Sequence, residues 1–261
     1  MTQAAYEKST ARYPSLVDRG VLVTGGASGI GESIVAHFAA QGSKVAFLDI
    51  VDDMAVALIE RLAPTVRHRP VYLRCDLTDI PALQAAIADL SASTGPFRVL
   101  VNNAGNDDRH AFATVTPAYW DERMAVNLRH QFFAAQAVHA GMRDAGGGAV
   151  VNLSSTSWVI GEGGYAAYTT AKAGIIGLTR SLARDMGADD IRVNAVLPGW
   201  IMTERQIRLW LTPEAEREQM ARQMIKRRLD AGDVARMVLF AAADDSSGIT
   251  GQSFVVDGGY A

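Results

Sequence analysis

Residues 21–31 read VLVTGGASGIG, and this stretch decides the fold. A short apolar run leads into a glycine-rich turn, and apolar residues then recur at helical spacing from Ile30 to Gln41. The order strand, turn, helix presents the first amides of a helix to a diphosphate, because glycine lets the backbone approach closely and the helix dipole favours an anion. A glycine-rich string alone could be an ordinary turn, so the flanking elements carry the prediction of dinucleotide binding.

The same alternation of short apolar runs and helical periodicity continues along the chain. Further strands are expected at residues 44–48, 71–75, 99–101, 149–153, 192–197 and 253–256, and helices at 51–63, 79–93, 116–145, 166–187 and 233–243. The strand segments are continuously apolar, which is typical of a parallel sheet covered on both faces. The pattern therefore predicts an α/β fold with a doubly wound parallel sheet, whose ligands bind beyond the carboxyl ends of the strands.

The domain organisation is predicted to be simple. Residues 1–18 are a polar arm without pattern, and residues 19–261 form a single dinucleotide-binding catalytic domain, since no linker or charge run divides them. The periodicity lapses at about 199–228, where Trp200, Trp210 and two methionines lie among many charges. This segment is interpreted as a mobile flap over the site, with an insertion that packs as a helical bundle as the alternative.

Composition excludes several classes of function. The chain of 261 residues has a net charge of −3, which gives no electrostatic footprint for nucleic acid or an anionic membrane. A single cysteine, Cys75, precludes an internal disulfide, and no apolar signal core or membrane-length span is found, so we expect a cytoplasmic protein. The five histidines do not have metal-ligand spacing, and no metal is predicted.

Acidic and amide side chains follow three of the predicted strands. Asp49, at the end of the second strand, could accept hydrogen bonds from ribose hydroxyls and repel a 2′-phosphate, which favours NAD over NADP. Alternatively, Asp49 caps the next helix. Asp76 and Leu77 could border the adenine or simply precede a helix, and the Asn102–Gly105 segment could meet the cofactor ribose or form a structural corner.

Three further side chains suggest proton transfer. Tyr168 and Lys172 are four positions apart in a predicted helix, so they share one face and the cation can lower the pKa of the phenol. Ser155 follows the strand at 149–153. All three groups could converge on one substrate oxygen.

Five motifs in order resemble the short-chain dehydrogenase/reductase family: TGGASGIG at 24–31, NNAG at 102–105, Ser155, YTTAK at 168–172, and Pro198-Gly199. The resemblance spans about residues 20–259 and implies a seven-stranded Rossmann-type sheet and a homo-tetramer or dimer, with the tetramer expected. It implies that Tyr168 is the general acid/base, that Lys172 binds the nicotinamide ribose and lowers the Tyr168 pKa, and that Ser155 hydrogen-bonds the substrate oxygen. It also implies that Asn127 supports a water relay to the lysine, although a helical Asn bonded to nearby backbone is the alternative.

The cofactor site combines the residue patterns with this resemblance, which adds the segment that would hold the nicotinamide carboxamide. The candidate cofactor-binding residues are Gly25, Ser28, Gly29, Ile30, Gly31, Asp49, Ile50, Asp76, Leu77, Asn103, Ala104, Gly105, Tyr168, Lys172, Pro198, Gly199, Ile201 and Thr203.

The polar run Asn106-Asp107-Asp108-Arg109-His110 after NNAG suits a ligand made of hydroxyls. With the surrounding residues it resembles the NAD-dependent aldose (D-xylose) 1-dehydrogenases, from which residues 160–165 depart. That resemblance implies hydrogen bonds from the sugar to Asn106, Asp107 and Arg205, and ring contacts with Trp158 and Trp200, beside Ser155 and Tyr168. Alternatively, the run is a salt-bridged surface loop, with Asp108 and Arg109 the most structural, and the tryptophans are core or subunit contacts.

The sequence thus predicts an oxidoreductase that transfers hydride from the C1 hydroxyl of an aldose to NAD and yields the aldonolactone. D-Xylose or a similar pentose or hexose is the expected substrate. Two alternatives stay open: an NAD-dependent enzyme for a non-sugar secondary alcohol, and a regulatory dinucleotide-binding protein without turnover.

Overall fold

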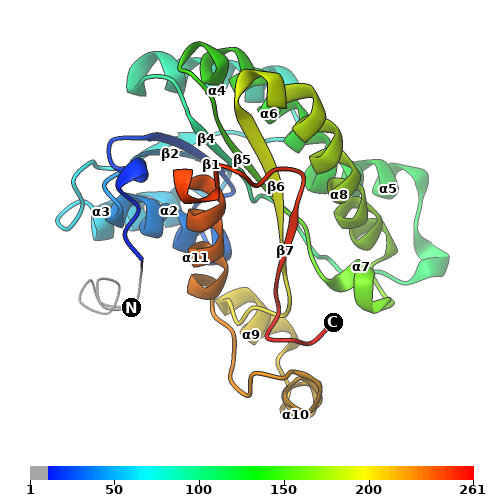
Figure 1. Cartoon of the computed structure of the whole chain (residues 1–261). Coiled ribbons are helices and arrows are strands. Elements are labelled where there is room, and N and C mark those ends of the chain that lie inside the picture. Colours follow the sequence, from blue (N-terminus) through cyan, green and yellow to red (C-terminus); the bar gives the residue numbers. More distant parts are fainter. Residues whose placement is uncertain (1–10) are drawn as a thin grey trace.

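The computed structural model describes residues 11–261, and its centre is the apolar run that opens the glycine-rich stretch. This run is β1 (Gly20–Thr24), the third strand of a seven-stranded parallel sheet with the order β3-β2-β1-β4-β5-β6-β7 (Figure 1). The other strands are β2 (Lys44–Asp49), β3 (Val71–Arg74), β4 (Val99–Asn102), β5 (Gly148–Leu153), β6 (Ile191–Pro198) and β7 (Ser253–Val256). The predicted doubly wound parallel sheet is confirmed.

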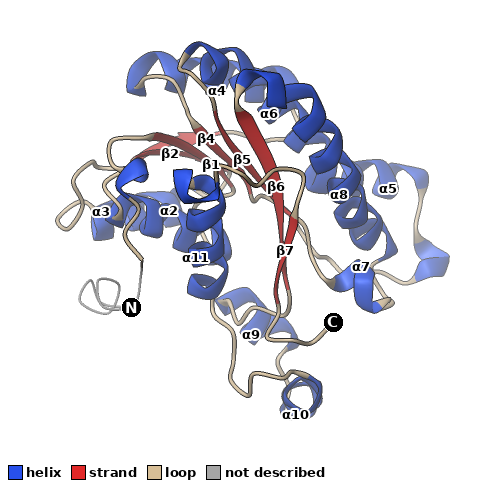
Figure 2. Cartoon of the chain, viewed as in Figure 1, coloured by secondary structure: helices blue, strands red, loops and turns tan. Residues whose placement is uncertain are grey.

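Helices cover both faces of the sheet (Figure 2). Val21 and Val23 of β1 pack with one buried cluster that includes residues of α2 (Gly29–Ala40), α3 (Asp52–Leu62) and α11 (Ala231–Ala242). Leu22 points to the opposite face and packs with residues of α4 (Ile80–Thr94), α6 (His130–Asp144) and α8 (Ala166–Met186). Successive strand residues face opposite sides of a sheet, so a continuously apolar strand is what this two-sided burial requires.

The chain changes direction in the sheet between β1 and β4, which are neighbours although two other strands separate them in sequence. Thr24 and Asn102, the last residues of these strands, are paired in the register. Such a switch point leaves a crevice outside the carboxyl ends of the strands, where ligands of this architecture bind.

The long helix predicted for residues 116–145 is interrupted. α5 (Pro117–Met124) passes into a five-residue π-helical turn, Ala125–Arg129, before α6 begins. Apolar periodicity cannot reveal one extra residue in a turn, and π-turns are frequent at functional sites. Asn127 lies in this turn, fully buried.

The segment at 199–228 forms two short helices beyond the carboxyl edge of the sheet, below it in Figure 1. α9 (Glu204–Trp210) and α10 (Pro213–Arg222) are each capped by a threonine, because Thr203 accepts a hydrogen bond from the Gln206 amide and Thr212 from the Ala215 amide. The remaining helical elements are α7 (Ser157–Ile160) and short 3-10 turns at Pro14–Leu16, Phe112–Thr114, Gly187–Asp189 and Asp244–Ser246.

The arm predicted for residues 1–18 lies partly outside the described residues, which begin at residue 11. Within the described part, Leu16 is fully buried, and Asp18 pairs with Arg67 and His68. Residues 11–18 therefore pack against the rest of the chain. In residues 11–261 no helix is at once long enough and apolar enough to span a bilayer.

Candidate active site

A cavity of about 1710 Å³ lies along the carboxyl ends of the strands. It is larger than the roughly 300–1,000 Å³ of a usual small-molecule pocket, so it can hold two ligands side by side. Every predicted site residue lines it except Asn127 and Trp158. In residues 11–261 no three His, Cys, Asp or Glu side chains lie together as metal ligands would.

The glycine-rich turn forms one end of the cavity. Gly25 and Gly29 have φ angles of +67° and +57°, which favour glycine, and a Cβ at Gly31 would lie 1.8 Å from the Gly25 carbonyl oxygen. Ser28, the N-cap of α2, makes no side-chain capping bond, so the first amides of this helix remain open to the cavity. This cradle fits the diphosphate of a dinucleotide cofactor.

The acidic residues make local bonds and also line the cavity. One Asp49 oxygen accepts from the Ala27 amide at 2.9 Å and the other from the Ile50 amide at 2.7 Å. Asp76 accepts from the amide and hydroxyl of Thr78, and the Asn103 amide group donates to the carbonyls of Thr24 and Gly25. Asp49, Asp76 and Asn103 therefore make the local contacts that the structural alternatives expected. All three residues also line the cavity.

The three side chains expected to transfer a proton all line the cavity. Tyr168 and Lys172 lie one turn apart on α8, and Ser155 follows β5. The Lys172 ammonium is 5.5 Å from the centre of the Tyr168 ring and donates to the Leu153 carbonyl at 2.8 Å. These three side chains, brought together from two elements, are close enough to share one substrate.

The effects that set the pKa of Tyr168 differ from the expectation. Burial raises the pKa of Tyr168 above its ordinary value and Asp107 adds to the rise, while the Ser155 hydroxyl, Arg109 and Arg205 lower it. Burial also lowers the pKa of Lys172 to about 8, although Asp107 acts in the opposite direction. The expected lowering of the Tyr168 pKa by Lys172 is therefore not what sets it here, because desolvation of the phenol is the larger effect.

Asn127 lies behind the cavity wall. Its amide group donates to the carbonyls of Asn106 and Arg123, and its oxygen accepts from the Asn106 amide at 2.8 Å. These are the hydrogen bonds to nearby backbone that the alternative interpretation of Asn127 expected. A Cβ at Gly105 would lie 3.0 Å from the Asn127 oxygen and 3.2 Å from the Lys172 ammonium, so Gly105 lets both side chains lie close to the backbone here.

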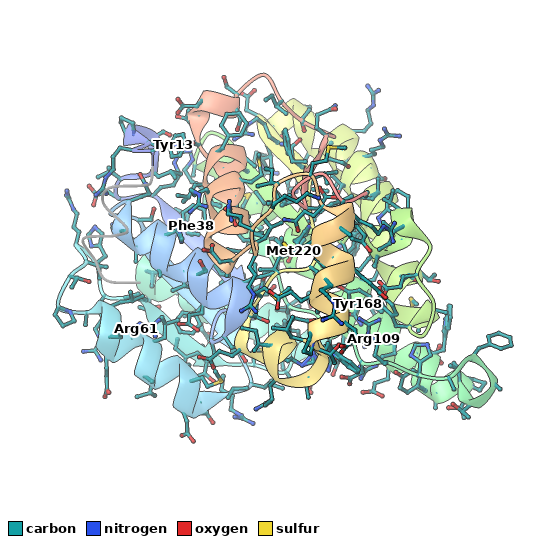
Figure 3. All side chains as sticks on the ribbon, turned by 90° about the horizontal axis from the view of Figure 1, so that it is seen from below. Tyr13, Phe38, Arg61, Arg109, Tyr168 and Met220 are labelled. Carbon is teal, nitrogen blue, oxygen red and sulfur yellow. The ribbon has the colours of Figure 1, made fainter. Side chains whose placement is uncertain are left out.

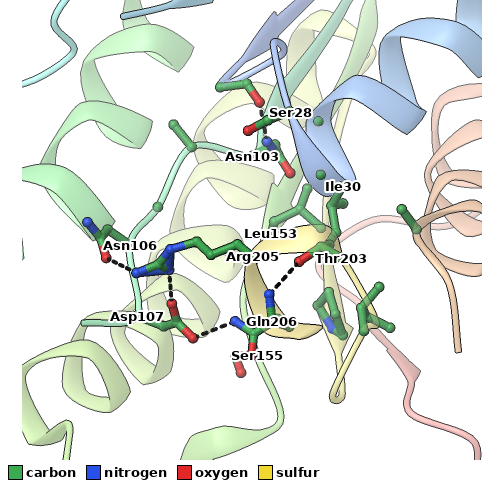
Figure 4. A pocket seen from close by; sticks show the side chains of 18 of the residues that line it. Ser28, Ile30, Asn103, Asn106, Asp107, Leu153, Ser155, Thr203, Arg205 and Gln206 are labelled. Carbon is green, nitrogen blue, oxygen red and sulfur yellow. Dashed lines mark hydrogen bonds and ion pairs between the residues drawn. The ribbon is translucent and has the colours of Figure 1, made fainter. Parts of the chain in front are cut away.

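The predicted sugar-binding residues meet one another across the cavity (Figure 4). Arg205 of α9 donates to Asp107 at 2.5 Å and to Asp108 at 2.7 Å, with a longer bond of 3.4 Å to Asn106. Gln206, which the sequence did not single out, donates to Asp107 at 2.8 Å and accepts from the Trp200 indole at 3.0 Å. These contacts tie α9 to the loop after β4.

Trp158 is not at the cavity, which corrects the expectation of a ring contact there. α7 is a single turn that buries Ser157 and directs the next side chain outward, leaving Trp158 38% exposed. Adjacent helical residues point about 100° apart, so only one of this pair can face inward.

Among the cavity-lining residues that were not predicted as site residues, four lie together: Arg109, Glu162, Tyr165 and Trp210. The Arg109 guanidinium lies 4.0 Å from the centre of the Tyr165 ring and 5.1 Å from that of Trp210. The Tyr165 ring is 5.6 Å from the Tyr168 ring. Seen from below, Arg109 and Tyr168 lie on the same side of the molecule (Figure 3). These four residues are far apart in sequence. The sequence signal for Glu162 and Tyr165 was that residues 160–165 depart from the pattern of the aldose 1-dehydrogenases.

A buried histidine behind the site predicts acid sensitivity. Burial lowers the pKa of His130 from 6.5 to about 4, and the Lys172 charge adds to this. Because the unfolded chain binds this proton more tightly, the free energy of unfolding should decrease as the pH falls from about 6.5 to about 4, by roughly 3 kcal/mol in all. Urea unfolding near pH 7 and near pH 4.5 should show a much smaller decrease for His130→Gln than for the wild type. Equal decreases would contradict this assignment.

Comparison with known proteins agrees with this geometry. A family profile described as "Enoyl-(Acyl carrier protein) reductase" matches residues 25–261. The chain is 50% identical over 250 residues to a probable galactose dehydrogenase of Rhizobium meliloti, covering 96% of this chain and 98% of the relative. It is 51% identical over 252 residues to the D-xylose 1-dehydrogenase of Caulobacter vibrioides, covering 97% and 99%.

A solved structure with the same fold is a 3-oxoacyl-[acyl-carrier protein] reductase with bound NAD from Brucella melitensis. It has a TM-score of 0.86 and 32% identity, and the match covers 99% of this chain and 95% of that one. The seven-stranded parallel sheet agrees with this structural match. The chain belongs to the short-chain dehydrogenase/reductase family of oxidoreductases.

Proposed function

We propose that this protein is an NAD-dependent aldose 1-dehydrogenase, which oxidises the C1 hydroxyl of D-xylose or a similar cyclic pentose or hexose to the aldonolactone. The observation that carries the proposal is the position of Ser155, Tyr168 and Lys172 in one cavity with the diphosphate cradle. Support for a sugar comes from the two relatives named for D-xylose and galactose, which are 51% and 50% identical over almost the whole chain.

Each side chain has its own role in the proposed reaction. Ser155 and Tyr168 hold the C1 oxygen, and Tyr168 as phenolate removes its proton. Arg109 and Arg205 favour the phenolate against the effect of burial. Lys172 and the glycine turn hold the cofactor, with Asn127 keeping the backbone behind Lys172 in place. A bound nicotinamide supplies the acceptor for the hydride that leaves C1.

The preference for NAD is part of this proposal and rests on Asp49. Its carboxylate lines the cavity at the end of β2, where it would repel a 2′-phosphate. Asp49→Ala is expected to weaken NAD binding and improve NADP binding. The dissociation constant for NADP divided by that for NAD should therefore fall by about tenfold or more, since 1.4 kcal/mol is a factor of ten. Titration of both cofactors measures this. Wild-type affinity for both in the variant would remove Asp49 from the selection.

NADH absorbance across a panel of aldoses and simple secondary alcohols tests the proposed function. An aldose 1-dehydrogenase oxidises several aldoses to lactones and turns over simple alcohols poorly. Turnover of alcohols alone would identify an enzyme for non-sugar substrates. Cofactor binding without turnover on any member would identify a regulatory protein.

The remaining expectations belong to the same proposal. We infer that α9 and α10 act as a flap over the sugar, supported by the contacts of Arg205 and Gln206 across the cavity. A homo-tetramer is inferred from the family, and a cytoplasmic location stays part of the same proposal. Gel filtration with light scattering measures the assembly.

A further inference from the structure

One wall of the cavity carries polar groups whose hydrogen-bonding capacity is unused. It is made by Arg109 from the loop after β4, Glu162 and Tyr165 from the loop before α8, and Trp210 at the end of α9. We call these four residues the distal cluster. They lie beside Tyr168, because the centre of the Tyr165 ring is 4.0 Å from the Arg109 guanidinium and 5.6 Å from the centre of the Tyr168 ring.

Two donors of the distal cluster have no acceptor. The Arg109 guanidinium makes no hydrogen bond with any described residue, although its Nη1 approaches a Glu162 oxygen at 3.7 Å. Among the same residues the buried Nε1 of Trp210 also has no partner. An N–H group that is buried without an acceptor is costly, so an oxygen from a ligand would relieve it.

One acceptor of the cluster is also available. Glu162 Oε2 accepts from the Tyr165 hydroxyl at 2.5 Å, which orients the carboxylate. Its Oε1 lies 3.7 Å from Arg109, beyond hydrogen-bonding distance, and can accept from a ligand. The pair of Arg109 and Glu162 carries no net charge. The cluster therefore combines free donors and a free acceptor around a neutral ion pair.

The neighbouring residues of the same loop and of α9 are different, because their polar groups already bond one another. Both oxygens of Asp107 accept hydrogen bonds, from Arg205 at 2.5 Å and from Gln206 at 2.8 Å. Arg205 also donates to Asp108. These residues hold α9 in place, so most of their capacity is used before a ligand arrives.

We propose that the distal cluster is a subsite for ring hydroxyls of an uncharged aldose, and that it decides which aldose is oxidised. This proposal rests on the proposed function, since C1 must lie at Tyr168 for the rest of the ring to reach the adjoining wall. A hydroxyl both donates and accepts, so it can bond Trp210 or Arg109 while donating to Glu162. A site built to bond a hydroxyl rejects a substrate that lacks it or places it elsewhere.

Trp210→Phe tests the subsite because it keeps an aromatic ring and removes only the N–H donor. The variant is assayed with a preferred aldose and with its analogues that lack one hydroxyl each. We expect kcat/KM for the complete sugar to fall by about threefold to tenfold, the usual range for one neutral hydrogen bond. One deoxy analogue should show no further fall, because it already lacks the bond. Trp158→Phe, outside the cavity, is the matched control and should behave as wild type.

Glu162→Gln tests the charge balance. It leaves the positive charge of Arg109 without a neighbouring negative charge, which favours an acidic sugar such as the corresponding uronate. The kcat/KM for this acidic sugar, divided by that for the neutral sugar, should therefore rise severalfold above the wild-type value. The subsite would be overturned if Trp210→Phe changed kcat/KM equally for every sugar or not at all. It would also be overturned if Glu162→Gln left the ratio of kcat/KM for the acidic and neutral sugars unchanged. Aldose oxidation by the wild type would still stand in each case. A wild type that oxidises no aldose would overturn the proposed function, and the subsite with it.

Discussion

Tyr168→Phe is expected to lower kcat for sugar oxidation by about 10²–10⁴-fold, the contribution of a positioned general base. The substitution removes the phenol proposed to take the C1 proton and keeps the ring beside Tyr165. Binding of the dinucleotide should change little, because the glycine cradle and Asp49 are untouched. Steady-state assays with a saturating aldose measure the first effect, and fluorescence titration with NADH measures the second.

Tyr13→Phe is the control for this experiment, because Tyr13 lies outside the cavity. Its kcat should equal that of the wild type. Near-normal turnover by Tyr168→Phe would assign the proton transfer to another group. Loss of NADH binding along with turnover would instead indicate that the substitution disturbs the site as a whole.

Gly31→Ala is expected to abolish most cofactor binding and to destabilise the fold. The new Cβ would lie 1.8 Å from the Gly25 carbonyl oxygen and 2.6 Å from the Asn103 amide nitrogen, so the turn that forms the diphosphate cradle must move. Overpacking of this kind costs about 1–3 kcal/mol in the free energy of unfolding. Affinity for NAD should fall by more than about tenfold, because the helix amides no longer converge on one anion. Urea unfolding and cofactor titration measure the two effects.

Gly187→Ala provides the contrast. Gly187 has a φ of −65°, and a Cβ there meets no atom within 4 Å. This variant should keep the cofactor affinity of the wild type and lose no stability, since alanine in a helical conformation is favoured over glycine. If Gly31→Ala bound NAD as tightly as Gly187→Ala, the cradle would not be the diphosphate site.

Much of the fold could be predicted because its signals are local. The apolar run Val21–Val23 marks a strand buried on both faces, and the glycines of the next turn mark a close backbone approach whatever surrounds them. The spacing of Tyr168 and Lys172 places both on one face of α8 without knowledge of the rest of the chain. Where one extra residue enters a turn, as at Ala125–Arg129, periodicity gives no sign of it, so the predicted helix at 116–145 is helical but contains an unpredicted π-turn.

The sequence by itself determined the sheet, the glycine-rich turn proposed to hold the cofactor and the three side chains proposed for proton transfer, because each depends on neighbours within a few residues or on the shared edge of a parallel sheet. Only the tertiary structure decided which side chains meet across the cavity. Asp107 and Arg205 are paired with each other, and Trp158 points outward. Arg109 meets Trp210 through the placement of α9, a long-range contact set by packing and charge rather than by spacing. The residues proposed for proton transfer are therefore encoded locally, whereas the wall proposed to select the sugar exists only in the folded chain.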